Sequence, residues 1–290
     1  MKKLLISVFS MCAAVVCSAQ LLTVDSPVKV ATGDLLPGKA VLSPDGTKVL
    51  VDDNAKAGLS IIDLTTSEVK MVSSTGYSYE MRFTGDGSQV AFRENTMKGL
   101  LRYQSAKTVN LATGATKELV APTRDLNAVT IAGDDVVAIE KGKLKGVKTS
   151  TMPIVSINRG ALYLTMNGKT TNISPNGVTG ESYLWPSVSP DGKHIVYYRA
   201  AYGCYVCDID GKNPVRLGII RAPQWIDNST IIGMHDNYNA SESHLVAAAI
   251  DGSVSQRLTD DTVIAMYPSV AAGKIAFTTP AGELYIMNIK

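Results

Sequence analysis

A short segment recurs along this chain, and it limits the possible folds more than any other feature. The clearest copy is Tyr183–Tyr198, YLWPSVSPDGKHIVYY, in which the letters SPDGK separate two strand-like runs. Pro190 fixes a φ suited to a turn, Asp191 can accept a hydrogen bond from its own backbone, and Gly192 tolerates a positive φ. The segment therefore predicts a β-hairpin.

Six copies of this hairpin can be aligned, three with the full turn and three with a degenerate one: 42–51, 83–92, 131–140, 188–197, 225–234 and 270–279. Most copies are followed by a second pair of strand-like runs with its own turn, at 59–72, 107–120, 161–173, 205–217 and 245–258. Each unit thus has four strands in about 45 residues, which is typical of a propeller blade.

The repeats predict an all-β fold, a six-bladed β-propeller with four-stranded antiparallel blades. The last unit ends one strand short at Lys290, whereas residues 21–32 precede the first copy and supply one strand too many. We expect this N-terminal strand to join the last blade, so that the ring has no open edge between its ends. The expected boundaries are 20–37 for the closing strand and 38–75, 76–123, 124–177, 178–219, 220–262 and 263–290 for the blades.

The first 19 residues have the pattern of a secretory signal peptide. Lys2 and Lys3 precede an apolar run from Leu4 to Val16, and small residues precede a cut after Ala19. Removing them takes away two lysines and no acid, so the formal net charge falls from +2 to zero. A neutral chain without a basic cluster argues against a nucleic-acid partner. We expect a monomer in the periplasm or outside the cell, with no membrane span and no lipid anchor.

The SPDG hairpin and the turn that follows it resemble the repeats of TolB-type propellers, also called PD40 or WD40-like repeats. They are similar as well to the propeller domain of prolyl-oligopeptidase-like enzymes. The resemblance covers essentially the whole mature chain and implies the fold. It implies little about function, because such repeats occur in unrelated roles. TolB-like proteins carry an α/β domain before the propeller and the peptidases a hydrolase domain with a GxSxG motif, and this sequence has neither.

The innermost strands of a propeller surround its axial channel. Alternation along these strands gives one apolar face, expected to pack between blades, which includes Phe83 and Trp225. The other face is polar and aromatic. It supplies a candidate ligand-binding ring at one channel mouth: Lys39, Glu80, Arg82, Trp185, Gln224 and Tyr267. The alternative is structural, with Arg82 paired to Glu80 and Trp185 covering a blade seam.

A second candidate is the polar loop 233–245, which is longer than a hairpin needs. A solvated loop is the simpler interpretation. The alternative is a divalent-metal site built from His235, Asp236, Glu242 and His244. No other cofactor is predicted.

Two further features have structural interpretations. Cys204 and Cys207 form a CxxC in a strand-like run, where positions three apart point to opposite faces, so we expect packed thiols rather than a metal or redox site. The lysine-rich segment 140–152 is expected to be a solvated loop or a guarded edge strand of the third blade. Its alternative is a contact for an acidic partner.

The sequence contains no recognisable nucleophile–base pair, metal triad or phosphate-binding loop. We therefore expect a non-enzymatic scaffold that binds an envelope protein or peptide. The alternative is a propeller that binds a carbohydrate or another small ligand, with a lyase or hydrolase activity at the channel mouth. Trp185 and Tyr267 would then serve as stacking platforms, and the 233–245 loop would supply a metal or acid–base groups.

Overall fold

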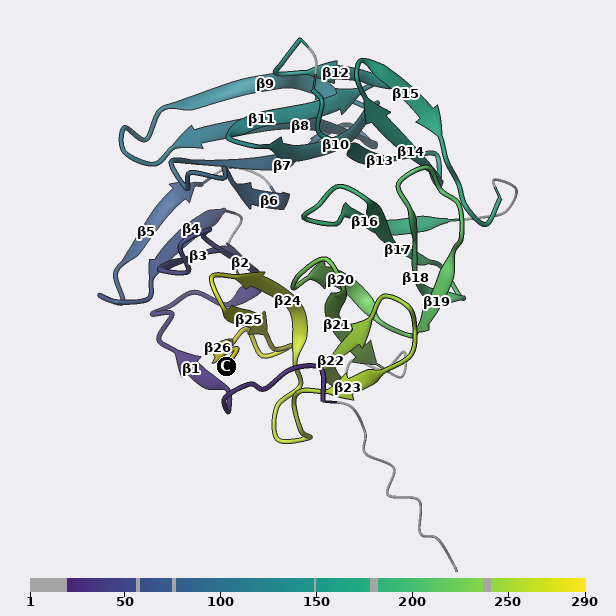
Figure 1. Ribbon diagram of the computed structural model, residues 1–290. Coiled ribbons are helices and arrows are strands. Elements are labelled where there is room, and N and C mark those ends of the chain that lie inside the picture. Colours follow the sequence, from purple (N-terminus) through teal and green to yellow (C-terminus); the bar gives the residue numbers. More distant parts are fainter. Residues whose placement is uncertain (1–19, 56–57, 75–76, 149, 178–181, 237–240) are drawn as a thin grey trace, which may run out of the picture.

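The chain forms seven small antiparallel sheets arranged in a ring around a central axis (Figure 1). The computed structural model describes residues 20–290 apart from 56–57, 75–76, 149, 178–181 and 237–240. The expected signal peptide, residues 1–19, lies outside the described residues. Within the described part of the chain, no helix is long and apolar enough to cross a membrane. The architecture is that of a β-propeller.

The first two blades each contain four strands: β2 (Pro37–Leu42), β3 (Lys48–Asp53), β4 (Leu59–Asp63) and β5 (Val69–Ser73), then β6 (Tyr77–Phe83), β7 (Gln89–Lys98), β8 (Leu101–Asn110) and β9 (Thr116–Thr123). Blades 3 and 4 each contain three: β10 (Leu126–Ala132), β11 (Asp135–Glu140) and β12 (Lys143–Lys145), then β13 (Ile154–Asn158), β14 (Ala161–Met166) and β15 (Lys169–Asn172).

The last three blades again contain four strands each. Blades 5 and 6 consist of β16 (Tyr183–Val188), β17 (His194–Arg199), β18 (Gly203–Asp208) and β19 (Val215–Gly218), then β20 (Arg221–Trp225), β21 (Thr230–Asp236), β22 (Ser243–Ala249) and β23 (Ser255–Arg257). Blade 7 joins the two ends of the chain: β24 (Met266–Ala271), β25 (Lys274–Thr278), β26 (Leu284–Asn288) and β1 (Val28–Val30).

The expected count of six blades is wrong, because residues 124–177 form two blades rather than one. The inner strand of the extra blade, β13, has no SPDG turn. Its hairpin with β14 is closed by Arg159 and Gly160, whose φ values of 50° and 80° are those of a tight two-residue turn. The lysine-rich segment contains β12, the outer strand of blade 3, which agrees with the expected edge strand.

The two three-stranded blades reverse the path of the chain between them. We call the face that carries the SPDG-type turns the lower face, and the opposite one the upper face. Gly192 of a lower-face turn lies beside Pro153, just before β13 begins, whereas the Tyr183 amide at the start of β16 bonds to the Gly160 carbonyl, just after β13 ends. Strand β13 therefore runs from the lower to the upper face, opposite to β16. Because blade 3 has three antiparallel strands, the chain leaves it at the lower face and enters blade 4 from there. Blade 4 also has three strands, so the chain leaves it at the upper face and β16 again starts from that face.

Aspartate carboxylates stabilise the turns on the lower face. In the first turn Asp45 accepts hydrogen bonds from the Ser43 hydroxyl at 2.6 Å and from the Thr47 amide at 3.0 Å. These bonds, the hydroxyl first, lower the pKa of Asp45 to about 2. Asp86 and Asp191 make the same contacts in the second and fifth blades, and their pKa values are lowered for the same reason. The aspartate of the repeated motif thus stabilises its own turn.

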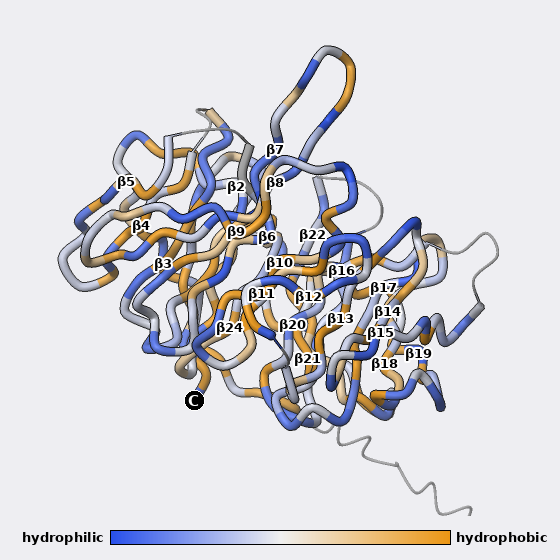
Figure 2. The backbone as a smooth tube through the Cα atoms, turned by 90° about the horizontal axis from the view of Figure 1, so that it is seen from above, coloured by the Kyte–Doolittle hydropathy of each residue, from blue (hydrophilic) through white to orange (hydrophobic). Residues whose placement is uncertain are grey.

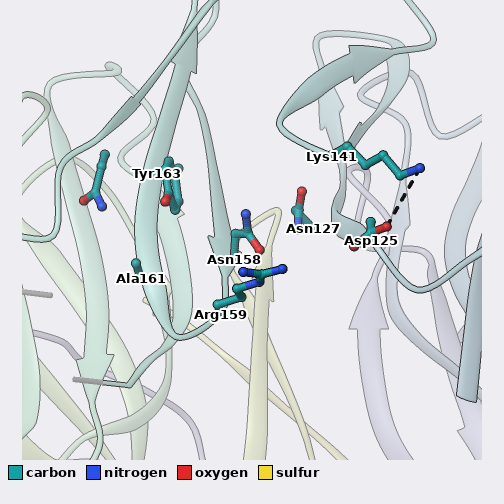
Figure 3. A pocket seen from close by; sticks show the side chains of 8 residues that line it. Asp125, Asn127, Lys141, Asn158, Arg159, Ala161 and Tyr163 are labelled. Atoms are coloured by element: carbon teal, nitrogen blue, oxygen red, sulfur yellow. Dashed lines mark ion pairs between the residues drawn. The ribbon is translucent and has the colours of Figure 1, made fainter. Parts of the chain in front are cut away.

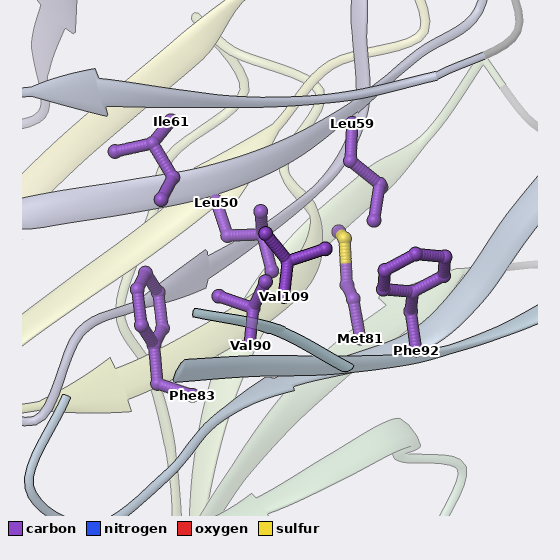
Figure 4. Close-up of a cluster of buried hydrophobic side chains, with 8 residues drawn as sticks. All are labelled: Leu50, Leu59, Ile61, Met81, Phe83, Val90, Phe92 and Val109. Carbon is purple, nitrogen blue, oxygen red and sulfur yellow. The ribbon is translucent and has the colours of Figure 1, made fainter. Parts of the chain in front are cut away.

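The hydrophobic core is divided among the seams between neighbouring blades. At the seam of blades 1 and 2, Leu50 and Ile61 pack against Met81, Phe83 and other side chains of the second blade (Figure 4). Each of the other seams has a cluster of its own among the described residues. The apolar face that the sequence predicts for the innermost strands lies in these clusters, which confirms that part of the alignment.

The two cysteines of the CxxC are buried, unbridged and on opposite faces of β18. Cys204 packs in the seam of blades 5 and 6, and Cys207 in the seam of blades 4 and 5. Burial raises the pKa of the Cys204 thiol and raises that of Cys207 to about 12. Both thiols are therefore protonated and packed, as the sequence predicts.

The ring closes as expected through the N-terminal segment. Strand β1 pairs with β26, with Val28 opposite Ile286 and Val30 opposite Leu284. A further bridge joins Val24 to Ile289. The N-terminal and C-terminal ends of the described chain therefore lie in one sheet, where β1 covers an edge of β26 that would otherwise be open.

Candidate functional site

Six of the innermost strands share an irregularity near their upper ends. The register with the second strand shifts at the same place in each of them, which marks a β-bulge. At four of these bulges a residue other than glycine has a left-handed φ of 46° to 50°: Glu80, Trp185, Ala222 and Tyr267. A bulge re-aims the side chain that it carries, and the left-handed backbone costs about 1–2 kcal/mol. The bulge thus recurs around the ring, with a different side chain at each of these four positions.

Three predicted ring residues provide aromatic and cationic contacts at the upper ends of these strands. The Lys39 ammonium lies 4.8 Å from the centroid of the Tyr267 ring, across the seam of blades 1 and 7. Trp185 is 36% exposed, and its ring meets that of Tyr198 edge-on, with centroids 5.6 Å apart. This level of the channel therefore presents a partly exposed indole and a cation over an aromatic ring.

Glu80 is held in place by a residue that the sequence did not single out. The expected alternative paired it with Arg82, but its carboxylate lies 2.7 Å from the guanidinium of Arg93, which is 5% exposed. Arg93 also donates to the Leu126 carbonyl at 2.9 Å and to the Gln104 side chain at 3.1 Å. This network ties blade 2 to blade 3 and leaves Arg82 without that carboxylate as a direct partner.

The other two predicted ring residues lie at a lower level of the channel. Arg82 and Gln224 follow the bulge, and both line an open cavity of about 360 Å³ near the lower face. The predicted ring is therefore two separate sets: Lys39, Glu80, Trp185 and Tyr267 above, and Arg82 and Gln224 below.

A larger cleft of about 560 Å³ lies at the upper face between blades 3 and 4 (Figure 3). Asn158 and Arg159 of blade 4 lie opposite Asp125 and Asn127 of blade 3. Seven of the eight residues that line the cleft carry a polar or charged group: Asp125, Asn127, Lys141, Asn158, Arg159, Tyr163 and Asn172, with Ala161 as the eighth. The sequence prediction missed it, because it merged the two blades that form its walls.

The charges of this cleft are predominantly positive. The Lys141 ammonium and the Asp125 carboxylate are 3.9 Å apart, and both are largely exposed, so their attraction is weak. Arg159 stands in the tight β13–β14 turn with its left-handed φ of 50°. Three asparagine amides and the Tyr163 hydroxyl add donors and acceptors. Such a set can bind a ligand that has many hydroxyl groups and a negative charge.

The predicted metal residues do not gather around one point. His235 and His244 are cross-strand partners on β21 and β22, with ring centroids 5.0 Å apart. His235 Nδ1 lies 2.9 Å from the Ile219 carbonyl, and Asp236 pairs instead with Arg221 at 3.2 Å. Glu242 is exposed, and residues 237–240 of the same loop lie outside the described residues.

A metal centre with three protein ligands does not fit this arrangement. Over the described part of the chain, no group of three or more His, Cys, Asp or Glu side chains could hold a metal ion. Burial lowers the pKa of His244, and the nearby Arg257 and His235 lower it further. The His244 imidazole is therefore mostly neutral at neutral pH, and it packs against the ring of His235.

Comparison with known proteins supports the fold. No family model and no curated protein sequence matches the chain. Among solved structures, an oligogalacturonate lyase in complex with manganese is 16% identical, with 87% of this chain and 76% of that one aligned and a TM-score of 0.51. The tricorn protease is 14% identical over 88% of this chain and 26% of that one, with a TM-score of 0.59.

A catalytically inactive variant of virginiamycin B lyase from Staphylococcus aureus, solved with quinupristin, gives a TM-score of 0.63. It is 11% identical, with 92% of this chain and 99% of that one aligned. At these identities the likeness concerns the propeller fold and not the activity.

Proposed function

We propose that this protein binds an acidic carbohydrate, or a small ligand of similar chemistry, in the upper cleft between blades 3 and 4. The observation that carries the proposal is the lining of the cleft: amides, a phenol and two cations face each other across a space of about 560 Å³. That volume is ordinary for a small-molecule site. Sugar hydroxyls would bond to the amides, and an acidic group would approach Arg159 and Lys141. Trp185, at the upper level of neighbouring blade 5, offers a partly exposed aromatic surface.

The ligand class is also suggested by one structural relative. An oligogalacturonate lyase, which is named for an acidic sugar polymer, shares this fold. The direct test is calorimetric titration of the protein with short oligogalacturonates and with a neutral oligosaccharide of equal length. We expect saturable binding of the acidic series only.

The variants Arg159→Gln and Lys141→Gln should each weaken that binding about tenfold, since each removes a charge-assisted hydrogen bond. The matched control is Lys117→Gln, which removes an exposed lysine on the outer strand β9 of another blade. If the two cleft variants bind as the wild type does, the proposal fails.

A separate assay tests whether the same cleft also catalyses a reaction on the bound sugar. An elimination reaction on an acidic sugar forms a conjugated carbon–carbon double bond, which ultraviolet absorbance detects. Because the described residues hold no three-ligand metal centre, we derive no metal-dependent step. The absorbance assay, run with and without added Mn²⁺, would reveal a lyase activity of the wild type. The same assay on His244→Ala would show whether this histidine takes part in the reaction.

A second candidate function, a TolB-like scaffold for a protein or peptide of the envelope, is favoured by one observation. The hairpin of β7 and β8 projects from the body of the propeller (Figure 2). Near its turn it carries three apolar side chains, Met97, Leu100 and Leu101, which are 60%, 98% and 45% exposed. Exposed apolar side chains that cluster at one place often mark a contact with another protein.

The scaffold proposal can be tested with a pull-down from envelope extract. We expect a protein to be enriched by the wild type and lost when Met97, Leu100 and Leu101 are replaced by serine. If the triple variant still enriches that protein, the hairpin is not its binding site. The same extracts test the proposed export, because the N-terminal residue of the native protein should be Gln20 if the segment 1–19 is cleaved.

A further inference from the structure

Arg82 occupies an unusual position for an arginine. It lies on the innermost strand β6, below the bulge, and it lines the lower cavity of the channel. Its Nε is buried without a hydrogen-bond partner, and the described residues make no ion pair with its guanidinium. Burial lowers the pKa of Arg82, although the field of Glu80 opposes this change. An arginine remains charged despite such a shift.

A cation that is partly buried without a direct counter-charge is costly, and proteins normally supply such a charge. Glu80 does not supply it by direct contact, because its carboxylate is bonded to Arg93 at 2.7 Å. Among the described residues that line the cavity, Arg82 is the only charged one. The cavity therefore has a positive charge without a negative charge from the protein.

The remaining polar groups at this level are donors that suit an oxyanion. Thr130, Gln224 and Ser269 come from three other blades and line the same cavity. The Ser269 oxygen accepts a hydrogen bond from the Leu42 amide at 3.0 Å, so its own proton is free to be donated elsewhere. The Ser187 hydroxyl, at the matching position of blade 5, is likewise buried without a partner.

We propose that the lower cavity is a binding site for a small oxyanion, a carboxylate or phosphate group, held by Arg82 with help from Thr130, Gln224 and Ser269. A guanidinium fork matches the two oxygens of such a group, which a single-atom anion cannot match. The cavity of about 360 Å³ is at the small end of ligand sites, which suits an anion of metabolite size. This site is separate from the upper cleft and does not depend on the function proposed there.

The test is calorimetric titration of the full mature protein with inorganic phosphate, acetate and chloride in a zwitterionic buffer. We expect saturable binding of phosphate or acetate with one site per chain, and weaker binding of chloride. Arg82→Met keeps most of the side-chain volume and removes the charge, so it should weaken oxyanion binding at least tenfold. Arg102→Met, which removes an exposed arginine on β8, should bind as the wild type does.

Two further variants keep the test decisive if Arg82→Met does not fold. Gln224→Leu should weaken binding several-fold while leaving the charge in place, and Lys117→Gln on the outer strand β9 should leave it unchanged. The melting temperature of the wild type should rise with the bound oxyanion, and that of Arg82→Met should not. The proposal is overturned if no probe binds saturably to the wild type, if Arg82→Met binds equally well, or if chloride binds as tightly as the oxyanions.

Discussion

Phe83 shows how one side chain supports the contact between two blades. It is 7% exposed and packs against residues of blade 1 in the first seam. Phe83→Ala should lower the free energy of unfolding by about 3–5 kcal/mol, since it removes a buried ring and leaves a cavity. Met71→Ala, on the outer strand of blade 1 and 67% exposed, is the control and should change stability little. Urea denaturation of both variants would measure the difference, and equal midpoints would contradict the seam assignment.

The carboxylate of Asp45 makes the stability of the folded protein depend on pH. Its pKa is about 2 in the folded protein, against an ordinary value of 3.8, because the Ser43 hydroxyl and the Thr47 amide stabilise the carboxylate. This contribution is fully present above pH 3.8 and is lost as the pH falls through 2. Asp45→Asn should therefore be less stable than wild type at pH 7, and the gap should narrow between pH 4 and pH 2. Urea denaturation at several pH values measures it; a gap that is constant with pH would contradict the assignment.

Arg159 has a strained backbone conformation in the β13–β14 turn, and it also lines the proposed binding cleft. Its left-handed φ is unfavourable for arginine, whereas asparagine before glycine is preferred in a two-residue hairpin turn. Arg159→Asn should therefore stabilise the protein by about 1 kcal/mol while weakening acidic-sugar binding. A melting curve and a titration on the same sample would show both effects. If Arg159→Asn lowers both the stability and the binding, Arg159 is needed for the fold and not specifically for the ligand.

This turn also explains which elements the sequence could predict. Strands β2, β6 and β16 were predictable because an SPDG-type turn follows each of them and fixes where the hairpin bends. Strand β13 was not, since its turn is only Arg159 and Gly160 and the segment before it is rich in lysine. The channel-facing positions of Arg82 and Gln224 followed from alternation along a strand. Their separation from Trp185 and Tyr267 did not, because the bulge between the two levels depends on backbone strain that has no residue signature.

The whole molecule depends on the joining of its two ends. Strand β1 brings Val30 onto the cluster of blades 7 and 1, and Val24 packs in the cluster of blades 6 and 7. The Leu21 and Leu22 amides both donate to the Gln256 side chain of blade 6, at 2.8 and 2.9 Å. The N-terminal segment therefore contacts three neighbouring blades, and it holds the ring together where the covalent chain does not.

Deleting residues 20–32 should consequently lower the melting temperature by about 10 °C or more, because several kcal/mol of burial and pairing would be lost at once. The control is Lys29→Gln, which removes the exposed ion pair with Glu283 but leaves the strand in place, and it should melt close to wild type. The deletion should also promote association of chains, since the free edge of β26 can pair with another strand. Scanning calorimetry with light scattering tests both effects. A deletion variant that melts like the wild type and associates no more than it does would mean that the ring closes without β1.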